Sequence, residues 1–161
     1  MKVIENGAAS PLLFHIAQYD SVVRDVHVML QREVVARMTA APGTADYGRL
    51  TVMLQARFAV TRLFTVPAGA FRPAPKVESA IARLVPLGEA KPRIDDPSLF
   101  ARIVAASFGQ RRKTLRNALR ACCDERLLTD AGIDPGARGE TLALEAFVRL
   151  ANLAASRAVR A

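Results

Sequence analysis

The sequence predicts an α/β protein in two parts, a partial sheet with its helices in residues 1–88 and a small all-α domain in residues 89–161. Strand-like and helix-periodic segments alternate up to about residue 87, whereas only helix-periodic segments follow. Between the two parts, residues 86–97 carry the proline, glycine and charged residues typical of a linker. Of the 161 residues 51% are hydrophobic, which is enough to form a core and excludes a disordered chain.

The first part opens with a helix, a strand and a second helix. Ser10 and Pro11 form the cap and first-turn pair typical of a helix start, which predicts a helix from there to about Tyr19. The apolar run over residues 25–31 predicts a buried strand, and the helical period of residues 32–40 predicts a helix directly after it.

One more helix and two more strands are predicted before the linker. Turn residues over 41–48 precede a helix over residues 49–58. Strands are predicted over residues 59–66 and 79–85, which are rich in apolar and β-branched side chains. Three strands make a small sheet, and parallel strands normally need helices on both faces, so we expect further strands in front of the first one.

The second part is predicted to contain helices over residues 98–107, 111–122, 124–131 and 141–158. Cys122 and Cys123 are adjacent in a helical pattern, where neighbouring side chains diverge, so we expect reduced core thiols rather than a disulfide. His15 and His27 have no cysteine or carboxylate at ligand spacing, and no metal site is expected.

The charge balance of the chain indicates a polyanionic partner. Lys and Arg total 23 against 15 acidic residues, a net charge of +8, and residues 91–161 alone hold 13 basic and 8 acidic residues, a net +5. No apolar run is long enough to span a membrane, and the opening MKVIENGAA has no export or transit pattern. We therefore expect no membrane partner and a cytoplasmic protein.

A basic cluster within the predicted helix 111–122 is the strongest binding signal. Its members are Arg111, Arg112, Lys113, Arg116 and Arg120. Helical spacing would align Arg112, Arg116 and Arg120 on one stripe, where like charges destabilise a lone helix. Nearby acids such as Asp124 would offset this repulsion on a solvated face, and RNA phosphates would offset it on a binding face. Arg138 is either a second contact or an ion-pair partner of Glu140 or another acid.

A stiff loop between the last two predicted strands carries an aromatic side chain in the sequence FRPAPKVES. Pro73 and Pro75 fix their own φ angles and bias the residues before them toward extended geometry, so the loop around Phe71 is pre-set. From the residues alone, Phe71 either anchors the loop in the core or is held ready for a ligand. Lys76 either contacts a phosphate or is a solvated lysine at the strand edge.

Six motifs follow one another along the chain: SPLLFHI, DVHVMLQREVVARM, YGRLTVM, FRPAPKVESAIARLVP, SFGQRRKTLRNAL and GIDPGARGETL. Their order and spacing resemble the C-terminal part of the 16S ribosomal RNA adenine N6,N6-dimethyltransferases, the KsgA family. The resemblance covers residues 10–155. It implies the second half of a Rossmann-like methyltransferase sheet, followed by a helical rRNA-binding domain.

The same resemblance implies an activity and a role for the stiff loop. Members of the family use S-adenosylmethionine to dimethylate two adjacent adenines in the hairpin loop near the 3′ end of 16S rRNA, so the implied partners are 16S rRNA and the small ribosomal subunit. Enzymes that modify a base take it out of its stack. In the family one wall for that base is the phenylalanine that is Phe71 here, with Pro73 and Pro75 shaping the loop and Lys76 beside it.

The sequence also departs from the family pattern. The glycine-rich turn that holds S-adenosylmethionine is not found, and residues 3–9 read VIENGAA where the family has Asn-Leu-Pro-Tyr. We therefore assign no catalytic, cofactor-binding or metal-binding residue, and interpret Glu33 and Glu78 as ordinary surface carboxylates. We expect this stretch alone to bind rRNA without binding the cofactor or methylating, and to self-associate through the free edge of the strand that begins at Asp25. The alternative is a non-enzymatic basic helical module that binds nucleic acid or assists assembly.

Overall fold

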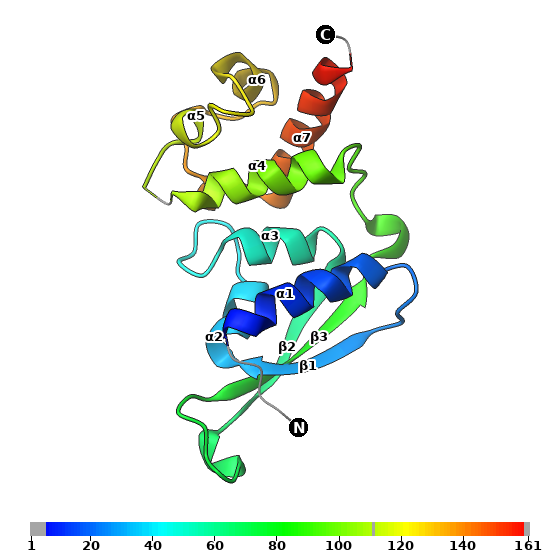
Figure 1. The fold of residues 1–161 in the computed structure, drawn as a ribbon, viewed down its shortest axis with the longest axis vertical. Helices are drawn as coiled ribbons and strands as arrows, with labels where there is room; N and C mark the ends of the chain where they lie inside the picture. The colour runs from blue at the N-terminus through cyan, green and yellow to red at the C-terminus, as the bar shows by residue number, and fades with distance from the viewer. Residues whose placement is uncertain (1–5, 111, 160–161) are drawn as a thin grey trace. The chain divides into compact units, whose positions relative to one another are not determined.

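The computed structural model describes residues 6–110 and 112–159, and within them two compact units. Of these residues, 6–40 and 53–91 form the first unit, and 41–52, 92–110 and 112–159 form the second. The predicted α/β class, with a partial sheet followed by helices, is confirmed (Figure 1). Helix α3 (Arg49–Gln55) begins in the second unit and ends in the first.

Three strands form the sheet of the first unit: β1 (Val26–Gln31), β2 (Phe58–Val66) and β3 (Ser79–Pro86). The order is β1-β3-β2, and β3 is antiparallel to both neighbours. Strands β1 and β2 therefore run in the same direction without pairing with each other. Among the described residues β1 pairs only with β3, so its other edge carries backbone groups without a strand partner.

The two faces of the sheet differ in burial. Residues paired across strands share a face, and Leu30, Ala80, Ala82 and Leu84 are fully buried on one of them. Helix α2 (Arg32–Met38) contacts all three strands and adds buried Val34, Val35 and Met38 to this core. On the other face the row Met29, Ile81 and Phe64 runs from half-buried to exposed.

Helix α1 (Asn6–Ile16) starts earlier than its sequence predicts. The expected start at Ser10 and Pro11 is wrong, because Pro11 lies inside the helix. A proline removes one helical hydrogen bond. Ala9, Leu13 and Ala17 repeat every four residues and are all buried, so packing holds the helix through the proline. A 3-10 turn, η1 (Ala17–Tyr19), follows α1.

Ion pairs join the connections at one end of this sheet. The carboxylate of Asp20, in the turn before β1, contacts Arg57, just before β2, at 3.4 Å, and it also accepts a hydrogen bond from Lys91, just after η3 (Gly88–Ala90). Burial raises the pKa of Asp20, but the hydrogen bonds and charges of Lys91 and Arg57 outweigh it, and the net pKa lies below the usual 3.8.

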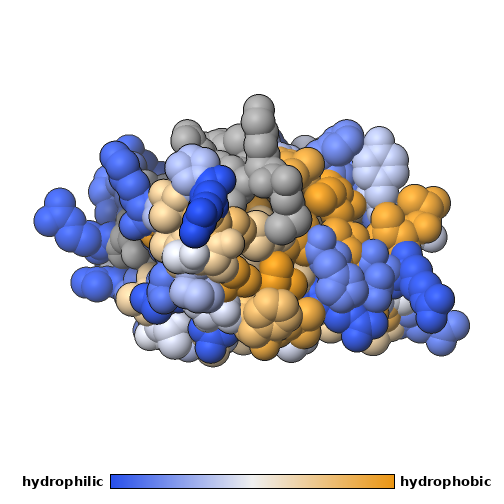
Figure 2. Space-filling view, turned by 90° about the horizontal axis from the view of Figure 1, so that it is seen from below, coloured by the Kyte–Doolittle hydropathy of each residue, from blue (hydrophilic) through white to orange (hydrophobic). Residues whose placement is uncertain are grey.

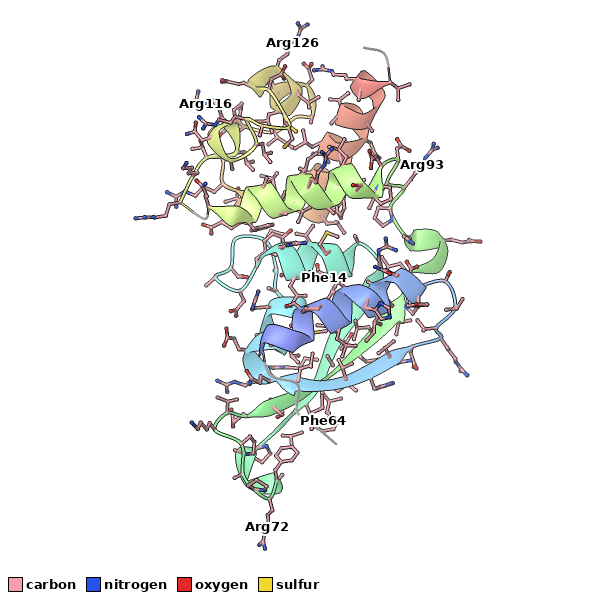
Figure 3. The ribbon with its side chains drawn as sticks, in the orientation of Figure 1. Phe14, Phe64, Arg72, Arg93, Arg116 and Arg126 are labelled. Carbon is pink, nitrogen blue, oxygen red and sulfur yellow. The ribbon has the colours of Figure 1, made fainter. Side chains whose placement is uncertain are left out.

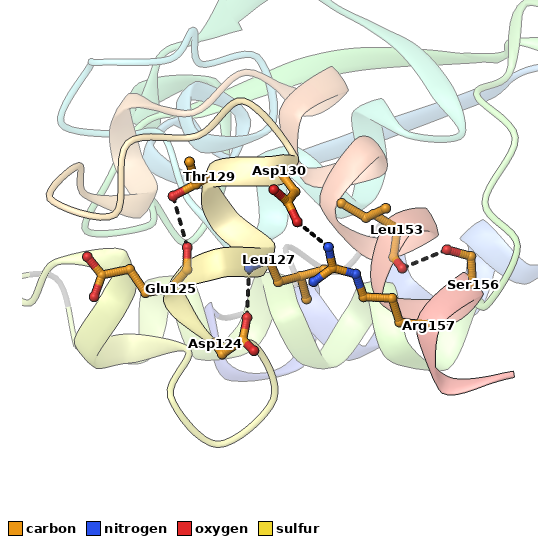
Figure 4. A network of polar contacts seen from close by, with 8 residues as sticks. All are labelled: Asp124, Glu125, Leu127, Thr129, Asp130, Leu153, Ser156 and Arg157. Carbon is orange, nitrogen blue, oxygen red and sulfur yellow. Dashed lines mark hydrogen bonds and ion pairs between the residues drawn. The ribbon is translucent and has the colours of Figure 1, made fainter. Parts of the chain in front are cut away.

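Four helices make up most of the second unit: α4 (Pro97–Gly109), α5 (Leu115–Ala118), α6 (Glu125–Asp130) and α7 (Leu144–Ala158). Asp96 and Asp124 cap α4 and α6 by accepting hydrogen bonds from Leu99 N at 2.9 Å and Leu127 N at 2.7 Å. Figure 4 shows the Asp124 cap together with the ion pair of Asp130 and Arg157, which joins α6 to α7.

An aromatic cluster fills the core of the second unit. Tyr47 is buried, donates a 2.8 Å hydrogen bond to the carbonyl of Leu142 and packs edge-on against Phe108, with ring centres 5.8 Å apart. Phe108 in turn lies 5.8 Å from Phe147 of α7. Burial, with a contribution from Glu145, raises the pKa of Tyr47 to about 12, so the phenol keeps the proton it donates. The turn-rich segment 41–48 is thereby fastened to the C-terminal helices.

In the described part of the chain, none of the helices is both long and apolar enough to cross a membrane.

Candidate nucleic-acid interface

The loop between β2 and β3 presents Phe71 in extended geometry, with φ −117° and ψ 152°. The ring is half-buried, and it follows a single 3-10 turn, η2 (Ala68–Ala70). Pro73 is exposed and Pro75 half-buried, and the Arg72–Pro73 peptide bond is cis. Phe71 is thus neither a fully buried core residue nor a fully exposed one.

Two hydrogen bonds fasten the end of this loop to the start of α2. The backbone N–H of Arg32 donates to the carbonyl of Glu78 at 3.0 Å, and the Arg32 guanidinium lies 2.8 Å from the Glu78 carboxylate. A cavity of about 360 Å³ opens beside this pair, lined by Gln31, Arg32, Glu33, Lys76, Val77 and Glu78. Lys76 is exposed and makes no ion pair with any described residue.

The cavity lies where β1 ends, and in open α/β sheets ligands bind outside the carboxyl ends of the strands. The first unit therefore places an aromatic ring, a free ammonium group and a hollow at one end of its sheet. Glu78 is an exposed ion-pair partner, and Glu33 lies in the first turn of α2, where a carboxylate favours the helix dipole.

The basic cluster of the second unit does not form the predicted long helix. The prediction of a helix over residues 111–122 is wrong, because α5 contains only Leu115–Ala118. The reason is long-range: the N–H groups of Leu115 and Arg116 donate to the carbonyls of Ala137 at 2.8 Å and Pro135 at 3.0 Å. These donors therefore take partners from the loop after α6, instead of the carbonyls four residues earlier that a continued helix would use.

The expected arginine stripe is lost with that helix. Arg112 and Lys113 lie in the turn before α5, Arg116 lies in α5, and Arg120 lies in the turn after it. All four side chains are exposed, and Arg111 lies outside the described residues. Arg116 is 3.5 Å from Glu125, and in Figure 3 Arg116 and Arg126 lie on the outer side of α5 and α6.

The remaining cations of this segment stay unpaired. Within the described ranges no ion pair involves Arg112, Lys113 or Arg120, and Arg138 does not pair with Glu140. Asp124, expected as a possible neutralising acid, caps α6 instead. The segment is therefore a turn–helix–turn surface with excess positive charge.

A further feature of this region is a close backbone approach that the sequence analysis missed. A Cβ atom on Gly139, in the 3-10 turn η4 (Gly139–Thr141), would lie 2.7 Å from the carbonyl oxygen of Ser107 in α4. The sequence signal for this approach is Gly139 itself, inside the motif GIDPGARGETL. Spacing along the chain does not show which segment this glycine approaches. Gly139 fixes how closely the loop that holds α5 approaches α4.

Comparison with known proteins gives the family of this fold. The profile described as "Ribosomal RNA adenine dimethylase" matches residues 3–156. The chain belongs to the ribosomal RNA adenine dimethylase family.

Several relatives agree with this family assignment. "Ribosomal RNA small subunit methyltransferase A" of Aromatoleum aromaticum is 56% identical over the whole of this chain and 62% of its own length. The protein with the same name in Xanthomonas campestris pv. campestris strain B100 is 56% identical over 90% of this chain and 55% of its own length. The chain thus spans less than two thirds of the length of these curated relatives.

Solved structures agree with the fold. A dimethyladenosine transferase from Plasmodium falciparum superposes with a TM-score of 0.78 at 22% identity, over 91% of this chain and 62% of the other. The 23S rRNA methyltransferase ErmE superposes with a TM-score of 0.63 at 25% identity, over 95% of this chain and 63% of the other. The predicted Rossmann-like character of the sheet is confirmed.

Among the described residues, no glycine-rich strand-to-helix turn is found, the feature by which the family resemblance implies that S-adenosylmethionine is held. The one described junction in which a strand runs directly into an α-helix, from Gln31 to Arg32, contains no glycine, and the positive-φ glycines, Gly43, Gly88 and Gly132, lie elsewhere. Residues 1–5, part of the segment where the family motif was expected, lie outside the described part. No step of a methyl transfer is therefore derived from these side chains.

The buried thiol of Cys123 offers no nucleophile. Cys122 and Cys123 are free, and burial together with the neighbouring Cys122 raises the pKa of Cys123 to about 12. At neutral pH this thiol is protonated and unreactive.

Proposed function

We propose that this chain supplies the RNA-recognition part of a small-subunit rRNA adenine dimethyltransferase. The single observation that carries the proposal is the β2–β3 loop, which holds the half-buried Phe71 and the exposed Lys76, a residue that lines an open cavity. Membership of the family and the names of its relatives support adenine in rRNA as the target. The partner is then the hairpin near the 3′ end of 16S rRNA, in the small subunit and in the cytoplasm.

In this proposal Phe71 stacks on the adenine that leaves its stack. Phe71 is half-buried, and Pro73 and Pro75 restrict the backbone of the loop, so little entropy is lost when the base arrives. Stacking on an aromatic ring contributes roughly 1 to 3 kcal/mol per base. Lys76 contacts a neighbouring phosphate.

The second unit contributes charge in this proposal. The exposed cations Arg112, Lys113, Arg116 and Arg120, together with Arg111, bind phosphates of the RNA without reading sequence. The loss of the helical stripe does not remove this role, because turn residues reach phosphates as well as helical ones do. It does mean that the contacts are spread over two turns and one short helix.

The binding test compares a hairpin RNA from the 3′ end of 16S rRNA with a DNA duplex of equal length, by filter binding at several salt concentrations. Changing Arg112, Arg116 and Arg120 to glutamine should lower the slope of log K against log salt by about two to three, since each lost contact removes roughly 0.7 to 0.9. Arg102→Gln, an exposed charge on α4, is the control. An unchanged affinity and slope in the triple variant would show a merely solvated surface.

Phe71→Ala tests the stacking role separately. A stacking residue has no counterion term, so the salt slope should stay the same. The affinity should fall by roughly 1 kcal/mol, the lower end of the stacking range, and only for hairpin RNA that presents the target adenine. Equal loss for an RNA without that adenine would indicate damage to the loop rather than a lost base contact.

We also propose that residues 1–161 by themselves neither bind S-adenosylmethionine nor methylate RNA. Titration calorimetry with the cofactor should give no binding isotherm. A one-to-one isotherm with low-micromolar affinity would overturn this part while leaving the RNA proposal intact.

A further inference from the structure

The β2–β3 hairpin differs in charge from the connections that precede the strands. Near Asp20 and Asp25, the cations Arg57, Lys91 and Arg83 are ion-paired. The hairpin carries three basic residues and no acidic residue over residues 59–77. Within the described part of the chain none of the three, Arg62, Arg72 and Lys76, forms an ion pair.

Exposed apolar side chains lie in the same hairpin. Phe64 is 59% exposed and Val77 48% exposed, although such side chains are usually buried. Figure 2 views this end of the molecule and shows hydrophobic surface beside hydrophilic residues. Figure 3 places Arg72 at the tip of the loop, pointing away from the sheet, and Phe64 nearer the strands.

A bulge in β2 sets the direction of Phe64. The register passes from Arg62 opposite Ala82 to Phe64 opposite Ile81, so Leu63 is the extra residue. Regular alternation would place Arg62 and Phe64 on the same face, but the bulge separates them, because Ile81 and Ala82 point to opposite faces. Phe64 therefore joins the less covered face, in the row with Met29 and Ile81.

Unpaired cations beside exposed aromatic rings are the combination that binds single-stranded nucleic acid. Resting on the proposed function, we infer that the hairpin-end surface, formed by Phe64, Arg72 and Val77 around the Phe71 loop, binds the single-stranded nucleotides that flank the target adenine. Arg72 binds a phosphate of this segment, and Phe64 stacks on one flanking base. Charge complementarity favours RNA as the occupant, since the segment carries only positive charge.

The charge part of this inference is tested with Arg72→Gln in the whole chain, against Arg24→Gln. Arg24 is an exposed cation in the turn before β1, so its replacement removes the same charge from the same unit. Arg72→Gln should lower the slope of log K against log salt for 16S hairpin RNA by about 0.7 to 0.9. Arg24→Gln should leave the slope unchanged. Equal slopes for the two variants would overturn the phosphate contact.

The stacking part is tested with Phe64→Ala, against Tyr19→Ala, which removes another exposed aromatic ring from the same unit. RNA with 2-aminopurine in place of a base next to the target adenine serves as probe. Phe64→Ala should weaken binding about 5-fold, the lower end of the stacking range, and restore fluorescence of the flanking probe, while Phe64→Trp should keep both.

Three results distinguish the outcomes of these tests. If the unchanged chain binds no RNA, the proposed function and this inference both fail. If Phe71→Ala weakens binding and Phe64→Ala behaves like Tyr19→Ala, only the stacking by Phe64 fails. If Phe64→Ala leaves RNA affinity unchanged and alters the mass found by light scattering, Phe64 is a protein contact and the inference is wrong.

Discussion

Gly139 shows how one residue can decide the spacing of two elements. The position has ordinary backbone angles, so only the lack of a side chain matters: a Cβ atom would lie 2.7 Å from Ser107 O and 3.0 Å from Ser107 Cβ. Ser107 is buried and its hydroxyl donates to the Ile103 carbonyl at 2.8 Å, so it cannot move aside freely.

Gly139→Ala should therefore lower the free energy of unfolding by about 1 to 3 kcal/mol, the usual cost of overpacking. Urea denaturation followed by circular dichroism measures it. Gly109→Ala is the matched control, because a Cβ atom there meets nothing within 4 Å and alanine favours the end of α4. A stability of Gly139→Ala equal to that of Gly109→Ala would show that the two backbones can separate at no cost.

At the scale of elements, the ion pairs of Asp20 link the connections before β1, before β2 and after β3. The side chain of Asp20 is only 8% exposed, so both partners act on a largely desolvated carboxylate. Its pKa is lower in the folded than in the unfolded protein, and the ionised form therefore stabilises the fold above about pH 4. This stabilisation is lost as the pH falls through the folded pKa.

Asp20→Asn should thus lower the free energy of unfolding by about 1 to 3 kcal/mol at pH 7, as expected for hydrogen bonds to a charged group. The difference from the unchanged protein should shrink as the pH falls through the folded pKa, below 3.8, where the native carboxyl becomes protonated. Urea titrations at several pH values measure both quantities. Glu78→Gln, which breaks an exposed pair, should cost less than about 1 kcal/mol. A pH-independent effect of Asp20→Asn would exclude the charged pairs as its cause.

At the scale of the whole molecule, the free edge of β1 is the feature with consequences for association. An edge with unpaired backbone groups invites pairing with another chain. We predict that residues 1–161 form dimers or larger species in solution, which light scattering measures.

Met29→Lys tests this prediction, since Met29 is half-buried on the less covered face of the edge strand and a lysine there opposes edge pairing. The variant should shift the protein toward monomer. A sharp monomer peak for the unchanged chain, with full amide-exchange protection in β1, would contradict the prediction.

The sequence by itself determined the strands, the motif loop and the family. Each of these depends on local signals: apolar runs for β1 and β3, two prolines shortly after Phe71, and six motifs in order. The strand ends agree with their predicted positions to within one residue. Runs of apolar and β-branched residues bounded by turn residues restrict where a strand can begin and end. The loop could likewise be located, although its role could not be settled from composition.

Tertiary structure decided the features that depend on contacts between residues far apart in the sequence. It carried α1 through Pro11 because buried Ala9, Leu13 and Ala17 outweigh one lost hydrogen bond, and it placed β3 between β1 and β2. It also ended the basic helix, since Leu115 and Arg116 donate to carbonyls some twenty residues away. Helical periodicity in a sequence reports only hydrogen bonds between residues four apart. These two N–H groups instead donate to carbonyls of the loop before Gly139, the residue that allows the close approach to α4.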